Sequence, residues 1–314
     1  MWTLESPQVY RSMGFWNDET QQALLNLNVA VGGVGGMGYL VGVELAHVGV
    51  QSLTVADPEP FEPVNANRVL GAREDTYGKN KAEAFRDDIL AINSDAHVNT
   101  YPEGINTDNV DDFVSGADVV IDALELSMPE LGTMVAQRAR DLGIFVVNAE
   151  YIGHGAQVTV FDPNSKMTFE RFMGIKGKKD ETTGKIRLEE VKGQTVATNR
   201  MMAYIPPYAD LKTLTALKEG ASLPSNMIGA GLAAQMAVAE VVKIARLKVG
   251  EKTMMPTVAP KVRWMDAYTG KADVTRYPRI SFYKHLGMAV VRNSFGLNEK
   301  AGYSKEQRLA RGDE

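Results

Sequence analysis

The feature of this sequence that most restricts its fold is a glycine-rich turn directly behind a short apolar segment. Residues Val29–Val31 run into Gly33-Val-Gly-Gly-Met-Gly38, and an apolar stretch of helical character follows from Met37 to Val48. Glycines at these spacings allow a tight turn, a close approach of the backbone to a phosphate and close packing of a helix on a strand. The helix N-terminus then offers unpaired N–H groups to an anion. The turn predicts a nucleotide site, but it does not indicate which nucleotide binds.

Length and charge exclude several classes of protein. The 314 residues suffice for one large α/β domain or two small ones. A formal net charge of −5 without a long basic run argues against nucleic acid as the main partner. The start of the chain has no secretory pattern, and there is no run of about 20 apolar residues that would predict a membrane span. We therefore expect a cytoplasmic protein that binds neither a membrane nor nucleic acid.

The cysteine and histidine content limits the chemistry. Cysteine is absent, so this chain can form no disulfide, no Cys₄ zinc site, no thiol nucleophile and no thioester. The four histidines show no metal-ligand spacing, which favours packing or surface positions for all of them (His47, His97, His154 and His285).

An acid follows the second predicted strand. Gln51–Ala56 has strand character and leads into Asp57, which lies 19 residues beyond Gly38. That offset is close to the distance of about 20 residues at which an acid binds a ribose hydroxyl in dinucleotide-binding folds. The alternative is that Asp57 only caps a turn with Pro58. Position and residue type together favour the ribose role.

The chain beyond Asp57 departs from the dehydrogenase pattern. Residues Glu59–Arg68 form a proline-punctuated loop with acids, two asparagines and an arginine. The helix predicted over Tyr77–Ile92 then carries Lys79 and Lys81 in its first turn. Cations there oppose the helix dipole unless an anion lies nearby, and a polyphosphate would be such an anion. The alternative for Lys79 is a solvated surface lysine.

The remaining pattern alternates strands with helices. Strands are expected over 97–101, 117–123, 144–147 and 156–161, and helices over 109–114 (with Asp108 as its cap) and 134–142. This alternation predicts an α/β fold with a Rossmann-like, doubly wound and mainly parallel sheet. A polar loop or small hairpin is expected over 174–184, a long helix from 224 to 247 with Asn226 as a possible cap, and a strand with a turn over 261–270.

The expected organisation has four parts. An N-terminal arm with a helix over 18–25 occupies 1–26, and a nucleotide-binding half occupies 27–163. A substrate-side half of the same domain, with the crossover, the long helix and antiparallel strands, occupies 164–290. A charged tail over 291–314 is expected to be flexible.

Five ordered motifs resemble the ThiF/MoeB/HesA superfamily of adenylyltransferases, which activate ubiquitin-like proteins and related peptides. The superfamily pattern is Gly-x-Gly-Gly-x-Gly, Asp-x-Asp, Ser-Asn-Leu-x-Arg-Gln, Gly-x-x-Lys and Ile-Asn-Pro. The matching segments are Gly33–Gly38, Asp57–Glu59, Val64–Val69, Gly78–Lys81 and Ile92–Ser94. The superfamily's long helix and closing strand are matched by 228–243 and 264–270. Residues 61–71 and 155–163 look most like a stand-alone bacterial ThiF-type branch without a zinc site.

The resemblance implies a reaction and a set of site residues. In the superfamily, ATP lies over the glycine turn and a carboxylate attacks its α-phosphate, which gives an acyl-adenylate and pyrophosphate. Arg11 matches an arginine that reaches ATP from the neighbouring subunit, which implies a homodimer. Glu125 stands where an acid holds magnesium. The remaining implied ATP contacts are the turn glycines (Gly33, Gly35, Gly36 and Gly38), Asp57 on the ribose, Glu59 as the second acid of Asp-x-Asp, and Asn65, Arg68 and Lys81 on the phosphates.

Three departures leave alternatives open. The acid is Glu125 followed by Leu126, where the superfamily has Asp followed by Asn. The second acid of Asp-x-Asp is Glu59, and the glutamine after the arginine is Val69. A nucleotide-binding scaffold without adenylation activity is therefore the main alternative. A nicotinamide-dependent oxidoreductase is less favoured, because it leaves Asn65, Arg68 and Lys81 without a role. The substrate, a small acid or a peptide or carrier-protein C-terminus, is not determined by the sequence.

Overall fold

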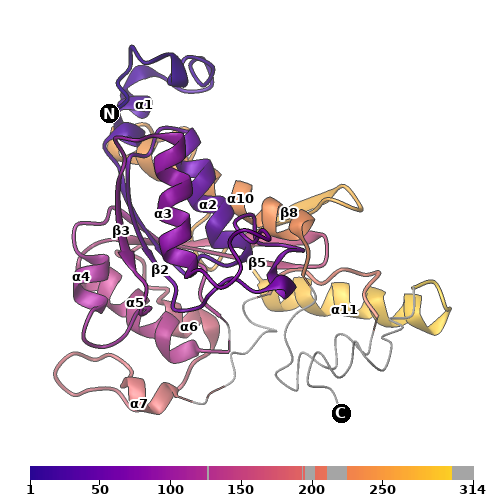
Figure 1. The fold of residues 1–314 in the computed structure, drawn as a ribbon. Coiled ribbons are helices and arrows are strands. Elements are labelled where there is room, and N and C mark those ends of the chain that lie inside the picture. Colours follow the sequence, from indigo (N-terminus) through magenta and orange to yellow (C-terminus); the bar gives the residue numbers. More distant parts are fainter. Residues whose placement is uncertain (126, 193, 195–201, 211–224, 299–314) are drawn as a thin grey trace.

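One eight-stranded sheet forms the centre of the computed structural model, which describes residues 1–125, 127–192, 194, 202–210 and 225–298 (Figure 1). The strand order is β3-β2-β1-β4-β5-β6-β7-β8. The first five strands are parallel: β1 (Asn28–Gly32), β2 (Ser52–Ala56), β3 (His97–Tyr101), β4 (Val119–Asp122) and β5 (Phe145–Ile152). The last three are antiparallel: β6 (Gly155–Phe161), β7 (Val262–Asp266) and β8 (Lys271–Thr275). The predicted mainly parallel, Rossmann-like sheet is confirmed.

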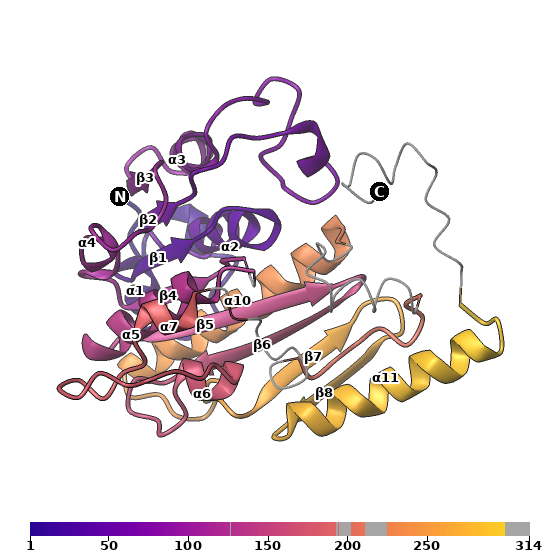
Figure 2. The ribbon, with the colours of Figure 1, turned by 90° about the horizontal axis from the view of Figure 1, so that it is seen from below.

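Helices cover both faces of this sheet (Figure 2). One face carries α2 (Gly36–His47), α3 (Lys81–Ile92) and α10 (Met227–Lys248), whose apolar side chains share one core cluster. The other face carries α4 (Val110–Val114), α5 (Pro129–Asp141), α6 (Phe169–Met173) and α11 (Pro278–Ser294). The remaining described helices are α1 (Asp18–Leu25), α7 (Leu188–Val191) and the 3₁₀ turns η1 (Pro7–Val9) and η2 (Pro63–Asn65). Because parallel strands are covered on both sides, β1 and β4 are apolar without alternation.

Helix boundaries differ from the predicted ones where a cap or a proline decides them. The helix expected from Tyr77 begins at Lys81, because the Asn80 side chain accepts hydrogen bonds from the N–H groups of Ala82 (2.9 Å) and Glu83 (3.2 Å). The short helix α4 follows Asn109, whereas the sequence predicts Asp108 as the cap. Helix α5 begins at Pro129, five residues before the predicted start, with proline in its first turn.

The predicted long helix α10 is present, and its cap is confirmed. The Asn226 side chain accepts a hydrogen bond from the Gly229 N–H at 3.1 Å. By length and composition, α10 is apolar enough to cross a membrane. It packs, however, against β5, β6, α1 and α2, and it carries a fully buried acid, Glu240. Its apolar character is therefore that of a core helix in a sheet domain.

The N-terminal arm and the last described helix, α11 (Pro278–Ser294), differ in how well the sequence predicted them. The N-terminal arm contacts the amino ends of the parallel strands: the Trp2 N–H donates to the Gln51 side chain, and Gln21 donates to the Val48 carbonyl. Helix α11 was not predicted, and it continues to Ser294, past residue 291 where the charged tail was expected to start. Residues 299–314 lie outside the described part. Within 174–184 and just beyond, Lys179 pairs with Ile186 across a tight turn, in line with a small hairpin.

Candidate functional site

The glycine turn between β1 and α2 is closely packed at two of its glycines and open at a third. Gly33 has a φ of +87°, and a side chain on it would place Cβ 2.5 Å from the Ala123 carbonyl oxygen. A Cβ on Gly38 would lie 1.9 Å from the Gly33 carbonyl oxygen, so the turn closes on itself only with glycine there. A Cβ on Gly35 would meet no heavy atom within 4 Å. The turn therefore leaves room for a ligand at Gly35.

Helix α2 begins at this open side. Gly35 occupies the N-cap position, and the first intrahelical bond runs from the Tyr39 N–H to the Gly35 carbonyl at 3.0 Å. The N–H groups of Gly36, Met37 and Gly38 precede that bond, and no acceptor for them occurs among the described residues. Unpaired N–H groups at a helix start and the positive end of the helix dipole favour an anion.

Asp57 lies beside the turn and is already engaged. Its carboxylate accepts hydrogen bonds from the N–H groups of Val34 (3.0 Å) and Glu59 (3.0 Å). The bond from Glu59, two residues on, is the turn-capping arrangement that the sequence left open. Burial raises the pKa of Asp57, while the nearby charge of Lys81 and the two backbone bonds lower it. The ribose role of Asp57 stays a prediction.

Lys81 is buried at the start of α3 with a partner from its own chain. Only 4% of the residue is exposed, and its Nζ lies 2.5 Å from Oε2 of Glu59. The anion that the helix start requires is therefore supplied by Glu59, whose side chain is exposed. Lys79 is exposed, as expected for a surface lysine. Lys81 and Glu59 lie together beside Asp57, so these three predicted residues form one charged group.

Arg68 lies against the start of α2, because a Cβ on Gly36 would be 3.4 Å from its Cγ. Its Nη1 donates to the Val64 carbonyl (3.0 Å) and to Oδ1 of Asn67 (3.1 Å), both neutral acceptors. In the described part of the chain, no carboxylate pairs with its guanidinium. The buried Asn65 shapes this loop, because its Oδ1 accepts from the Glu62 N–H at 3.0 Å. Arg68 therefore presents an uncompensated positive charge that suits a phosphate.

Two residues that the sequence analysis missed hold this loop in place. The Asn67 side chain donates to the Ser225 carbonyl at 2.9 Å, and the Met227 N–H donates to the Asn67 carbonyl at 3.0 Å. These bonds join the Arg68 loop to the start of α10 across 158 residues of sequence. A contact over such a separation leaves no local pattern, so motif reading could not have found it.

Acids collect where β4 and β5 end. Asp122 accepts from the Leu124 N–H (3.3 Å) and from Nδ2 of Asn148 (3.1 Å), and the same amide reaches Oε1 of Glu150 at 3.3 Å. Burial raises the pKa of Asp122 to about 6. Burial and then the charge of Asp122 raise the pKa of Glu150 well above its ordinary range, and Glu125 adds to this effect. Glu125 itself is exposed in the loop after β4 rather than at the strand end.

Two further observations limit the site. Among the described residues there is no group of three or more histidines, cysteines or acids arranged to hold a metal ion. Magnesium bound to ATP needs only one or two carboxylates besides the phosphates, and Glu125 with the neighbouring Glu150 fits that requirement.

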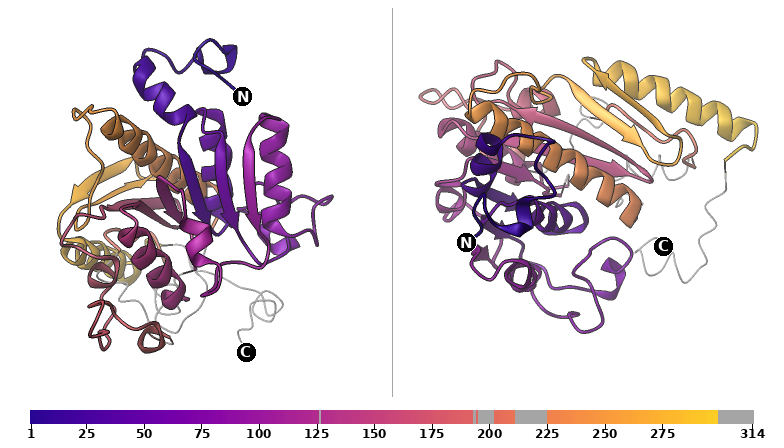
Figure 3. Two further views of the ribbon diagram at one scale, coloured as in Figure 1. Left: turned by 90° about the vertical axis from the view of Figure 1, so that its left-hand side faces the viewer. Right: turned by 90° about the horizontal axis from the view of Figure 1, so that it is seen from above.

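Arg11 is exposed and lies in the arm, which packs at the amino ends of the parallel strands (Figure 3). The glycine turn lies at the carboxyl ends, so one subunit does not bring Arg11 to it.

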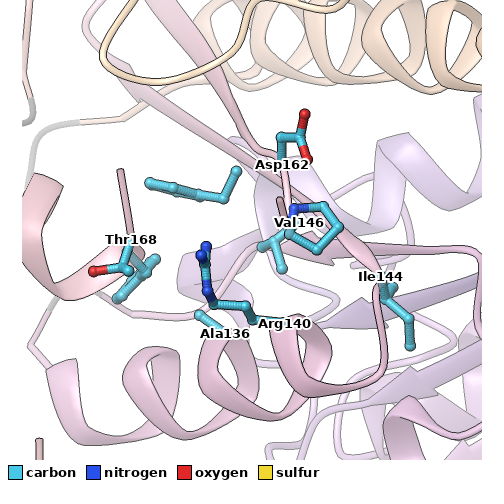
Figure 4. A pocket seen from close by; sticks show the side chains of 9 residues that line it. Ala136, Arg140, Ile144, Val146, Asp162 and Thr168 are labelled. Carbon is cyan, nitrogen blue, oxygen red and sulfur yellow. The ribbon is translucent and has the colours of Figure 1, made fainter. Parts of the chain in front are cut away.

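A small pocket elsewhere is not part of this site. Figure 4 shows it between the end of α5 and the start of β5, with Arg140, Ile144, Val146 and Asp162 among its lining residues. These positions lie at the amino end of β5, whereas Tyr151 and Ile152 lie at the other end of β5, and the Tyr151 hydroxyl approaches the glycine turn. The nucleotide site that the geometry supports is the open edge at the carboxyl ends of β1, β4 and β5, where open α/β sheets bind ligands.

The fold and the glycine turn define a nucleotide-binding α/β domain, and comparison with known proteins identifies its family. The chain belongs to the ThiF family, whose model matches residues 9–281. It is 31% identical over 145 residues to the adenylyltransferase and sulfurtransferase UBA4 of Saccharomyces cerevisiae, which covers 46% of this chain and 32% of that protein. The chain thus spans about a third of the length of this relative. The resemblance to the ThiF superfamily is confirmed.

Two further comparisons cover more of the chain. The tRNA threonylcarbamoyladenosine dehydratase of Escherichia coli is 25% identical over 225 residues, which covers 68% of this chain and 80% of that protein. The crystal structure of E. coli MccB with ATP superposes with a TM-score of 0.62 at 19% identity, over 86% of this chain and 72% of that one. At that identity the likeness shows the shared fold.

Proposed function

We propose that this protein is an ATP-dependent adenylyltransferase that activates a carboxylate as an acyl-adenylate and releases pyrophosphate. The observation that carries the proposal is the set of hydrogen-bond donors at the open side of the glycine turn. Unpaired N–H groups lie at the start of α2, where a Cβ on Gly36 would be 3.4 Å from Cγ of Arg68. No described carboxylate neutralises the Arg68 charge. A site that offers donors and positive charge in fixed positions stabilises an anionic phosphate chain and its transition state.

The position of each residue in the fold suits it to one part of ATP. Asp57 lies beside Val34 at the turn, on the β2 side of β1, which suits the ribose. The N–H groups of Gly36–Gly38 and the Arg68 fork would hold the phosphates, with Lys81 as a point charge. Holding the chain in line with the incoming carboxylate lowers the barrier by orientation, and the cations disperse the charge of the leaving pyrophosphate.

The proposal also includes a magnesium site, a homodimer and a class of substrate. Glu125, with Glu150 beside it, would hold magnesium, which neutralises phosphate charge when bound. Arg11 would reach the site of a second copy, which makes the active form a homodimer. The names of similar proteins support a peptide or small-protein substrate: one is the SAMP-activating enzyme E1 of Haloferax volcanii, and one is MccB crystallised with the peptide MccA.

Removal of the two site cations tests the proposal. We expect Arg68→Ala and Lys81→Ala each to abolish ATP–pyrophosphate exchange and to weaken ATP binding in calorimetry by tenfold or more, on the order of 1.4–3 kcal/mol for a lost charge-assisted bond. Lys79→Ala is the matched control, because Lys79 is exposed two residues away and should bind ATP as the unaltered protein does. Exchange that survives both site substitutions contradicts the assignment. ATP binding without exchange would favour the scaffold alternative.

A further inference from the structure

Tyr151 is a polar residue at the glycine turn to which the proposed roles above give no part. It is the next-to-last residue of β5, and its side chain is half-buried. A Cβ on Gly36 would lie 2.5 Å from the Tyr151 hydroxyl oxygen and 3.3 Å from the Arg68 carbonyl oxygen. The hydroxyl therefore sits directly on the first residue of α2, beside the Arg68 loop. A side chain on Gly36 would displace the phenol from this position.

The surroundings of this hydroxyl keep it protonated and leave it able to donate. Burial raises the pKa of Tyr151, while the charge of Arg68 and a hydrogen bond with the Ser225 side chain lower it by less. A phenol has one donor and two acceptor positions. If its oxygen accepts from Ser225, its proton is free for an acceptor in the open space beside Gly36. Arg68 beside it disfavours a cation there and favours an anion.

The position of Tyr151 is supported from two sides. Its ring packs against the start of α10, where a Cβ on Gly229 would lie 3.2 Å from the ring. Ser225 is held in turn by the Asn67 side chain, which donates to its carbonyl at 2.9 Å and whose Oδ1 accepts from Arg68 at 3.1 Å. Tyr151, Ser225, Asn67 and Arg68 therefore form one connected group. A shift of the Arg68 loop would move the partner of the phenol as well.

We propose that Tyr151 is a phosphate-binding residue of this site, whose hydroxyl donates to the same ATP phosphate group that Arg68 and the start of α2 bind. The inference rests on the proposed function, and it names a contact that the motifs do not include. One anion is then bound by three donors of different kind. They are a backbone N–H of α2, the guanidinium of Arg68 and the phenol of Tyr151 on β5. A neutral donor adds selectivity by direction rather than by charge.

Removal of the hydroxyl alone tests this role. In calorimetry with MgATP, we expect Tyr151→Phe to raise Kd about fivefold to tenfold, the loss of one hydrogen bond to a charged group, with a melting temperature within about 2 °C of the unaltered protein. Tyr208→Phe is the matched control. It removes a hydroxyl that bonds to Asp266 at 2.8 Å and that no described contact joins to the turn glycines, so the Kd for ATP should not change. Ser225→Ala should give a smaller increase in Kd than Tyr151→Phe.

The possible results separate this inference from the proposed function. An unaltered protein that binds no ATP overturns both. ATP binding by the unaltered protein with the same Kd in Tyr151→Phe overturns the phosphate contact alone. An equal rise in Kd for Tyr208→Phe, or a rise for Tyr151→Phe that comes with a large fall in melting temperature, shows a structural role and also overturns the contact.

Discussion

The glycines of the turn do different things, although the motif treats them alike. Gly33 is needed because its φ is positive and the Ala123 carbonyl lies against it, and Gly38 because the turn folds back on the Gly33 carbonyl. Gly36 lies against the Tyr151 hydroxyl. Only Gly35 faces open space. A motif match to this turn therefore combines requirements of folding with one requirement of binding, and substitution can separate them.

Alanine at Gly35 and at Gly38 should have opposite consequences. Gly38→Ala places a methyl group 1.9 Å from the Gly33 carbonyl oxygen, so we expect a loss of about 3 kcal/mol in the free energy of unfolding. Gly35→Ala meets no atom within 4 Å and should change stability by less than about 1 kcal/mol, while ATP affinity falls tenfold or more because the methyl group enters the ligand space. Urea unfolding and calorimetry measure the two effects. Unchanged ATP binding by Gly35→Ala would place the phosphates elsewhere.

Glu44 on α2 predicts how stability depends on pH. Burial raises its pKa from 4.5 to about 7, and no described side chain pairs with it. The folded protein then binds more protons than the unfolded chain between these values, so this group's contribution to stability is present at pH 4.5 and lost as the pH rises through 7. Glu44→Gln mimics the protonated form. It should match the unaltered protein at pH 4.5 and exceed it by roughly 1–3 kcal/mol at pH 8.

Urea unfolding of both proteins at the two pH values checks this expectation. A stability difference that stays the same at pH 4.5 and pH 8 would show that Glu44 titrates at its ordinary pKa. The comparison is independent of the nucleotide site, because Glu44 lies two turns along α2 from the glycines.

At the scale of elements, α10 holds the two halves of the sheet together through one buried acid. Glu240 accepts from the Thr257 N–H (2.8 Å) and hydroxyl (2.9 Å) and from Lys243 (3.0 Å), and it also pairs with Arg263 on β7. Its carboxylate is fully buried and each of its bonds is to a donor, so the charge is well compensated. The antiparallel strands are fastened to the parallel ones at this point.

Removal of the Glu240 carboxylate should destabilise the fold more than removal of its partner Lys243. We expect Glu240→Ala to lower the free energy of unfolding by about 3–5 kcal/mol, because two donors of Thr257 and the Arg263 guanidinium lose their acceptor. Lys243→Ala removes an i,i+3 partner that is more exposed, and it should cost less than about 1 kcal/mol. Thermal and urea unfolding measure both. Equal losses in the two variants would mean that Glu240 acts through Lys243 alone.

The sequence predicted those elements whose signals are local. The apolar runs of β1 and β4, the glycine turn and the Asn226 cap of α10 were all found by pattern, because period and capping chemistry act over a few residues. Helix α11 was missed, and only Pro278, His285 and Ala289 of it are buried, so it lacks a strong apolar period. The predicted start of α3 was wrong by four residues, because the Asn80 cap outweighs the helical pattern before it.

The motifs name candidate site residues, but they do not show where distant segments meet. The family resemblance names Arg68 and Lys81 as phosphate contacts, and that role stays a prediction. The bond from Asn67 to Ser225 and the position of Tyr151 on Gly36 depend on tertiary packing, which no local pattern encodes. The structure adds Glu59 as an ion-pair partner of Lys81, which the sequence did not indicate.

At the scale of the whole molecule, the site is incomplete in one subunit if Arg11 contributes to it. The arm lies at the amino ends of the parallel strands, and the glycine turn lies at the carboxyl ends. Arg11→Ala and Arg68→Ala should each abolish tight ATP binding. When equal amounts of the two variants are dissociated and reassembled together, half of the dimers contain one subunit of each. Each mixed dimer has one intact site, so about one quarter of all binding sites should be regained. No recovery on mixing contradicts a shared site.

The most direct test of carboxylate activation is ATP–pyrophosphate exchange with the full chain, MgATP and labelled pyrophosphate, screened against small carboxylic acids and peptide C-termini. Exchange measures reversal of the step that forms the acyl-adenylate, so it reports adenylation itself and not ATP binding or hydrolysis. We predict that label enters ATP only with a suitable carboxylate and magnesium, and that an amidated form of the same peptide gives none. Two results would contradict carboxylate activation with ATP. One is ATP binding without exchange for any carboxylate or C-terminus tested, and the other is tighter binding of a nicotinamide nucleotide than of ATP.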